Sequence, residues 1–175
     1  DNSTLYNRLV VWVEGTKYNG NLGGRSGADA KCNNSKPGDL LSDLNNIHAL
    51  LSVYDDDIAA MPSNYGYSTT KSIYWYHKTG KNFTLLDYSW DDMLDGSIQN
   101  SGNAGTGYTG EYWTGSSVDG EGGGDASSCS YNPDACSCGS GTGASNKWLQ
   151  GTSSYYATQG DLGYVDNKWI RSGCP

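Results

Sequence analysis

The sequence predicts a single α+β domain, in which short antiparallel strands, two short helices and a long loop region rich in Gly and Cys share one core. Runs of β-branched and aromatic residues alternate with turn sequences, which favours short strands. Leu, Ile, Val and Phe together make up only 25 of the 175 residues, but six Trp and fourteen Tyr supply apolar area. Because Gly accepts positive φ, the 25 Gly predict many tight turns.

The clearest strand and helix patterns lie before residue 100. Residues 9–14 (LVVWVE) predict a buried strand, and residues 26–32 predict a short helix with Ser26 as its N-cap. Leucines at helical spacing predict a second helix over residues 39–46. By the same patterns we expect strands at residues 49–54 and 71–77, a short strand or the start of a helix at residues 83–86, and a helical turn at residues 90–96.

Turn-forming residues dominate the rest of the chain. Short strands are expected at residues 111–115, 147–149 and 168–170, whereas residues 119–144 contain almost no aliphatic side chain. A stretch of that length without secondary structure is typically functional or disordered, and its three Cys favour an ordered loop held by disulfides. We therefore expect a long loop region, about residues 116–146, within one domain that spans residues 1–175.

Charge and hydropathy exclude several partners. The net charge is −8 and the 11 Lys and Arg form no basic stripe, so the sequence predicts no binding to nucleic acid. The excess of carboxylates instead favours cations, above all Ca²⁺ outside the cell. No apolar run reaches the length of a membrane span, and a chain that starts at Asp1 without Met is expected of a secreted product after cleavage.

Five Cys favour an extracellular protein, because disulfides persist in oxidising compartments. The odd number leaves one thiol free, paired between molecules or without its partner. Glycosylation-type triplets begin at Asn2, Asn33 and Asn82, which predicts a glycoprotein in a glycosylating host. The sequence therefore predicts a secreted or cell-surface protein.

No enzyme motif is present in the sequence, so we expect a binding protein and not an enzyme. The only two histidines, His48 and His77, are interpreted as structural. The acidic runs at residues 55–57 and 91–92 are interpreted as a solvated turn or as charges at a helix N-terminus. Nothing selects a pair of carboxylates for glycoside hydrolysis, which makes a secreted hydrolase the last alternative.

The aromatic residues divide by context. Four tryptophans lie in strand-like runs and are expected in the core: Trp12, Trp113, Trp148 and Trp169. Seven tyrosines lie among Gly, Ser and Thr, which is typical both of adaptable binding loops and of a core short of aliphatic residues: Tyr65, Tyr67, Tyr74, Tyr76, Tyr108, Tyr155 and Tyr156.

The N-terminal part of the chain resembles a bacterial surface domain. Residues 18–24 (YNGNLGG) and 27–32 (GADAKC) are similar to the opening of a domain found in leptospiral endostatin-like surface proteins. Shorter similarities follow in the same order at residues 49–52, 112–115 and 119–120, at Lys147 and Trp148, and at Cys174. The resemblance implies a C-type lectin-like fold, in which the two chain ends form adjacent strands.

The resemblance also implies the disulfides. In that fold a Cys on the first helix bridges a Cys on the last strand, which implies a bond between Cys32 and Cys174. Such a bridge closes a long loop and stabilises a fold by about 4–5 kcal/mol in the chain-entropy model. Cys129 would then pair with Cys136 or Cys138. A bridge between Cys136 and Cys138 is disfavoured, because the single residue between them leaves too little room for a relaxed disulfide.

A triplet in the long loop resembles the calcium and sugar site of C-type lectins. Those proteins carry Glu-Pro-Asn or Gln-Pro-Asp there, and this chain places Asn132 and Asp134 on either side of a Pro. Calcium is therefore the expected cofactor, with Asp119, Glu121, Asp125 and Asn146 completing the site and Tyr155 and Tyr156 as further ligand contacts. Residues 145–148 (SNKW) depart from the usual Trp-Asn-Asp motif, and an ordinary turn at residues 132–134 is the alternative interpretation.

The leading hypothesis is a secreted or cell-surface adhesion domain that recognises a glycan or an extracellular matrix protein through its long loop. A structural subunit of an extracellular filament or sheath is the alternative from another class. The odd Cys and a polar surface rich in Gly and Tyr suit such self-association.

Overall fold

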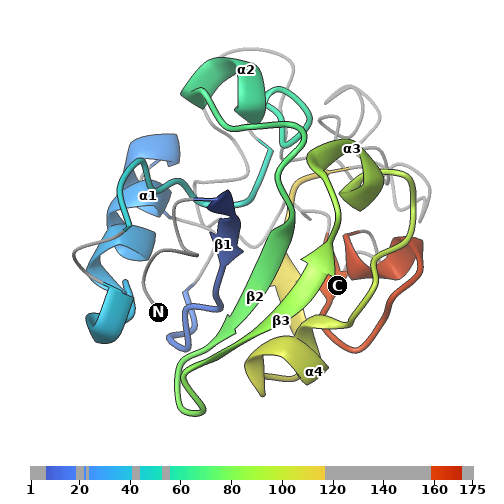
Figure 1. The fold of residues 1–175 in the computed structure, drawn as a ribbon. Coiled ribbons are helices and arrows are strands. Elements are labelled where there is room, and N and C mark those ends of the chain that lie inside the picture. The colour runs from blue at the N-terminus through green and yellow to red at the C-terminus, as the bar shows by residue number, and fades with distance from the viewer. Residues whose placement is uncertain are drawn as a thin grey trace, which may run out of the picture.

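The computed structural model describes residues 7–18, 22, 24–40, 44–52, 56–116 and 159–170, and their fold is α+β, as predicted (Figure 1). The larger sheet has the strand order β1 (Leu9–Val11), β2 (Ile73–His77), β3 (Asn82–Asp87), and a smaller sheet pairs β4 (Glu111–Trp113) with β5 (Gln159–Asp161). Two of the three pairings are antiparallel, whereas β1 runs parallel to β2. The expectation of antiparallel strands is wrong for β1, because a long crossover through α1 and α2 separates it from β2.

Four helices surround the larger sheet within the described ranges. α1 (Gly24–Asn34) lies beside β1, and α4 (Gly102–Thr106) packs against β2 and β3 (Figure 1). α2 (Met61–Tyr65) and α3 (Trp90–Met93) are single turns. Serine side chains cap α3 and α4: Ser89 accepts a hydrogen bond from the backbone N–H of Asp92, and Ser101 accepts one from Ala104.

The predicted strands that correspond to β1, β2, β3 and β4 are confirmed, as are the predicted helices that correspond to α1 and α3. α1 begins at Gly24, so Ser26 lies inside the helix and is not its N-cap. The acidic pair at residues 91–92 lies in the first turn of α3, as expected for charges at a helix N-terminus. Helices α2 and α4 and strand β5 were not predicted.

Two predicted elements, one helix and one strand, are replaced by 3₁₀ turns. In place of a helix over residues 39–46, the chain forms a 3₁₀ turn at Gly38–Leu40, and residues 44–46 are not helical. In place of a strand at residues 168–170, a 3₁₀ turn forms at Asn167–Trp169. The side chain of Asp166 accepts a hydrogen bond from the backbone N–H of Lys168 at 3.0 Å, which starts this turn.

The predicted strand at residues 49–54 is also wrong where the structure describes it. Residues 49–52 bend at Leu50, where the backbone N–H of Leu51 donates to the carbonyl oxygen of Ala49 at 3.0 Å, and they join no sheet. The carbonyl oxygens of Ala49 and Leu51 accept hydrogen bonds from the side chain of Arg25, and the backbone N–H of Ser52 donates to Thr114. These bonds occupy the backbone groups that a neighbouring strand would need.

Aromatic side chains fill much of the core, as the composition predicts. Trp75, Trp90 and Trp169 are almost fully buried, and Tyr76 is buried as well, whereas Tyr108 is exposed. The main core cluster contains Ile58, Met61, Ile73, Trp75, Leu86, Trp90, Met93, Ile98, Leu162, Trp169 and Ile170. A second, smaller cluster of Leu22, Ala28, Ala49 and Leu51 packs α1 against residues 49–51.

No helix in the part of the chain that the structure describes combines the length and apolar character needed to cross a membrane.

Gly105→Ala should lower the free energy of unfolding by about 1–3 kcal/mol, the usual cost of forcing an extra methyl group into a packed core. A Cβ at this position would overlap Cβ and Cγ of Trp75, which the β2 ladder holds in place. Chemical denaturation measures the change. Gly38→Ala is the matched control, because nothing lies within 4 Å of a Cβ there. Equal unfolding free energies for the two variants would contradict this packing.

Candidate functional site

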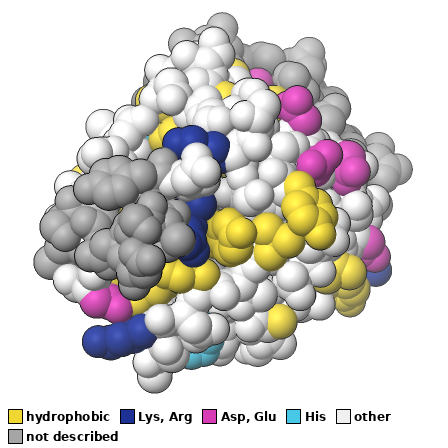
Figure 2. All heavy atoms as spheres, in the orientation of Figure 1, with side chains coloured by type: hydrophobic (Ala, Val, Ile, Leu, Met, Phe, Trp, Pro, Cys, Tyr) yellow, Lys and Arg dark blue, Asp and Glu magenta, His cyan; other side chains and the backbone are white. Residues whose placement is uncertain are grey.

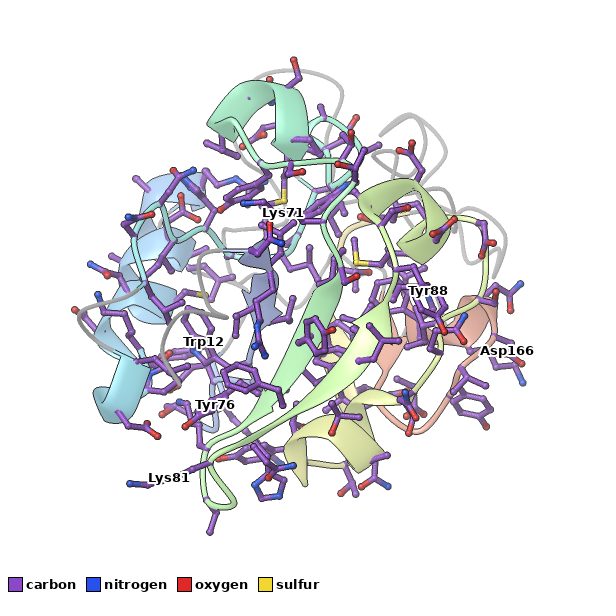
Figure 3. The ribbon with its side chains drawn as sticks, viewed as in Figure 1. Trp12, Lys71, Tyr76, Lys81, Tyr88 and Asp166 are labelled. Carbon is purple, nitrogen blue, oxygen red and sulfur yellow. The ribbon has the colours of Figure 1, made fainter. Side chains whose placement is uncertain are left out.

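A pocket of about 370 Å³ is lined by β1 and its flanking residues, by Cys32 of α1, and by residues 44–50 and 66–68. Lys71 and Trp12 also contribute to its lining. Figure 3 places Lys71 between β1 and α2, and Trp12 between α1 and the sheet. The pocket is therefore built by the α1 side of the larger sheet and by residues 44–50 of the chain that follows α1.

The lining combines aromatic rings, amides and basic groups. Among the described residues it includes no Asp or Glu, although the whole chain has a net charge of −8. Figure 2 shows basic side chains beside a strip of apolar side chains near the centre of this face. The guanidinium of Arg8 lies over the rings of Tyr74 and Phe83, 4.9 and 4.5 Å from their centroids. The polar and aromatic residues of the lining are Arg8, Trp12, Asn45, Asn46, His48, Tyr67, Ser68, Lys71 and Trp90.

Arg25 fixes the backbone of the segment that forms one wall of this pocket. Its guanidinium donates to the carbonyl oxygens of Ala49 at 2.6 Å, Leu51 at 2.6 Å and Asp56 at 2.9 Å. Its Nε lies 2.7 Å from a carboxylate oxygen of Asp56. A planar guanidinium satisfies several acceptors at once, which the single ammonium of Lys does not do in this geometry.

Asp29 lies one helical turn after Arg25 and holds the start of the same segment. One carboxylate oxygen accepts a hydrogen bond from the backbone N–H of Ala49 at 2.8 Å. The other lies 2.7 Å from Nδ1 of His48. The helix thus presents a cation and an anion on one face. Together these two side chains contact four residues of the chain that follows the helix: His48, Ala49, Leu51 and Asp56.

Asn46 links the pocket wall to α2. Its Nδ2 donates to the carbonyl oxygen of Tyr65 at 2.6 Å, and its Oδ1 lies 3.2 Å from Nε2 of His48. Its backbone carbonyl accepts a hydrogen bond from the hydroxyl of Tyr67 at 2.7 Å. Asn46 has a φ of 55°, a left-handed conformation that Asn tolerates better than most residues and that these three contacts maintain. We refer to Arg25, Asp29, Asn46, His48, Asp56, Tyr65 and Tyr67 as the Asp29 network.

The rings of Tyr65 and His48 stack, with centroids 3.6 Å apart and an interplanar angle of 21°. The hydroxyl of Tyr65 donates to the carboxylate of Asp56, which also accepts from Asn64 at 2.8 Å. Burial and the bond to Asp56 raise the pKa of Tyr65 to about 12. Burial opposes ionisation of Asp56, but the bonds from Tyr65 and Asn64 and the charge of Arg25 outweigh it and hold the pKa of this carboxyl below its usual value.

Cys32 lies on the pocket lining as a free thiol. Burial, followed by the charges of Asp29 and Glu14, raises its pKa to about 11, so the thiol is protonated at neutral pH and is a weak nucleophile. Its predicted disulfide partner, Cys174, lies outside the described residues, and that pairing stays a prediction.

The titratable groups of the site are engaged by contacts within the protein. Both ring nitrogens of His48 are engaged, by Asp29 and by Asn46, so neither is placed to take a proton from a substrate. Among the residues with described placement, no cluster of three or more His, Cys, Asp or Glu is suited to a metal ion.

Most of the sequence-predicted site residues lie outside the described residues. Three are described: Cys32, which lines the pocket, and the glycosylation candidates Asn33 and Asn82, which are exposed near the end of α1 and at the start of β3. The predictions for the others stay untested: Asn2, Asp119, Glu121, Asp125, Cys129, Asn132, Asp134, Cys138, Asn146, Tyr155, Tyr156 and Cys174.

The sequence interpretation missed the Asp29 network. Residues 55–57 were interpreted as a solvated turn, which is wrong for Asp56 because its carboxylate pairs with Arg25. Tyr65 and Tyr67 are half-buried in the network and do not form an exposed binding loop. The spacing of Arg25 and Asp29, four residues apart on a predicted helix, was the one signal in the sequence, and it did not identify their partners.

A scan of the chain against protein-family models finds no matching family, and a search of curated proteins finds no matching sequence.

The stability of the fold should fall in acid, and part of this loss should come from Asp56. A carboxyl whose pKa is depressed in the folded state stabilises above its unfolded pKa, about 3.9 for Asp, and this contribution disappears as the pH falls through the folded value. Asp56→Asn should therefore lower the melting temperature at neutral pH, and its difference from wild type should shrink in acid. Asp91→Asn, at an exposed site on α3, is the control. A difference that is independent of pH would contradict the assignment.

Proposed function

We propose that this chain is an extracellular binding domain that recognises a glycan in the pocket beside β1. The observation that carries this proposal is the lining, in which aromatic rings and neutral polar groups face the same space. Ligand pockets typically combine apolar and aromatic walls with a few polar groups that set orientation. A sugar ring has apolar C–H faces and a rim of hydroxyls. The rings of Trp12 and Tyr67 suit the faces, and Asn45 and Ser68 suit the rim.

The size of the pocket favours a glycan over a folded matrix protein. Its volume of about 370 Å³ is near the small end of the range for ligand pockets, roughly 300–1,000 Å³. A short saccharide fits such a space, whereas a protein partner needs a contact area of about 800 Å² on each side.

A C-type lectin-like arrangement belongs to the same proposal. β4 and β5 pair antiparallel and bracket residues 114–158, which is where that fold inserts a long loop. The order of β1 followed by α1 supports the same assignment. The predicted calcium site around Asp134 would form a second site within the bracketed region and is a separate prediction. The similarity of residues 18–24 to a bacterial surface domain supports a location at the cell surface.

A glycan array, followed by calorimetry with the glycan that binds best, tests the pocket directly. Asn45→Ala should weaken binding about threefold to tenfold, the equivalent of one neutral hydrogen bond. Asn45 is exposed on the pocket lining, so its loss should leave the fold intact. Asn103→Ala is the matched control, because Asn103 is equally exposed on α4 and does not line the pocket.

Both measurements are made with calcium and with a chelator. Binding that requires calcium and is unchanged by Asn45→Ala would assign the ligand to the long loop and overturn the pocket assignment. A chain that binds no glycan under either condition would overturn the proposed function.

A further inference from the structure

The two ring nitrogens of His48 both face oxygen atoms. Nδ1 lies 2.7 Å from the carboxylate of Asp29, and Nε2 lies 3.2 Å from Oδ1 of Asn46. A carboxylate and an amide oxygen are acceptors and have no hydrogen to offer. A neutral imidazole has one N–H, so one of these two contacts would set a lone pair against a lone pair. An imidazolium has two N–H groups and satisfies both contacts.

The orientation of the Asn46 amide is fixed by an independent contact. Its Nδ2 donates to the carbonyl oxygen of Tyr65 at 2.6 Å. Exchanging Oδ1 and Nδ2 would bring two oxygens together at that short distance, so the amide oxygen must face His48. The ring of His48 also stacks on Tyr65, a contact that favours a cation over an aromatic face.

We propose that His48 is held as an imidazolium, and that loss of its proton releases residues 44–48, which form one wall of the pocket. The neutral ring would keep its N–H toward the charged Asp29 and turn a lone pair toward Asn46. Asn46 would then lose one of the contacts that hold it at a positive φ. The pocket wall is therefore ordered while His48 is protonated and becomes loose as the pH rises.

The other titratable groups around His48 do not change charge in the same pH range. On α1, Arg25 stays cationic beside Asp29, which accepts from both His48 and Ala49. On the α2 side, burial and neighbouring charges raise the pKa values of Tyr65, to about 12, and of Tyr67. The pKa of Asp56 is lowered, so this group stays ionised. The wall therefore responds to one proton on one ring.

His77 provides a reference within the same molecule. The backbone N–H of Gly80 donates to Nδ1 of His77 at 2.7 Å, so this nitrogen carries a lone pair and the ring is neutral while the turn is formed. The chain has no other histidine. The structure therefore predicts opposite protonation states for the two rings in one sample.

Nitrogen NMR of the whole wild-type chain, labelled with ¹⁵N in histidine, tests the proposal without any ligand. The variant His77→Gln assigns the signals. At about pH 7 His48 should show two protonated ring nitrogens and His77 one. As the pH rises, the His48 nitrogen that faces Asn46 should lose its proton, and the backbone amides of residues 44–48 should shift with the same midpoint.

Asn46→Gly gives a second test, because Gly keeps the positive φ but removes the amide oxygen that faces the ring. His48 should lose its proton at a lower pH in this variant, while His77 should be unchanged. The proposal is overturned by a His48 ring with a single protonated nitrogen at neutral pH, by a ring that titrates without shifts in residues 44–48, or by an unchanged midpoint in Asn46→Gly. Since no ligand is present, these results are independent of the glycan proposal.

Discussion

The guanidinium of Arg25 donates the hydrogen bonds that a neighbouring strand would normally donate to the backbone carbonyls of residues 49–51. It binds the carbonyl oxygens of Ala49 and Leu51 and the backbone and carboxylate of Asp56. A buried carbonyl without a donor costs about as much as a lost hydrogen bond, so this one side chain satisfies groups that otherwise oppose burial of the segment. The second core cluster forms only because the segment lies against α1 in this position.

The two walls of the pocket are consequently built in different ways. The β1 wall is backbone paired with β2, and its register depends on a ladder that no single charge controls. The opposite wall, at residues 44–50, is held by side chains of the Asp29 network. A ligand that contacted both walls would favour the conformation in which the network is formed, so its affinity would depend on the state of the network.

Local patterns predicted much of the fold, and long-range contacts explain the rest. The alternation in β2 and the helical spacing in α1 are properties of neighbouring residues, and both elements were predicted. α4 was missed because its glycines oppose a helix; Gly105 is required there by close contact with Trp75, a residue far away in the chain. The site was missed for the same reason, since the partners of Arg25 lie 24 to 31 residues beyond it. A sequence indicates that Arg25 and Asp29 share a helix face, but the fold determines what they meet.

The pairing of β4 with β5 has a consequence for the chain between the two strands. Backbone hydrogen bonds hold Glu111 opposite Asp161, so the two ends of the intervening chain are closed by the framework itself. The entropy of closing a flexible loop rises slowly with its length, by about 0.6 kcal/mol for each doubling. A change in the number of residues between these two strands should therefore alter the entropic cost of closure only slightly.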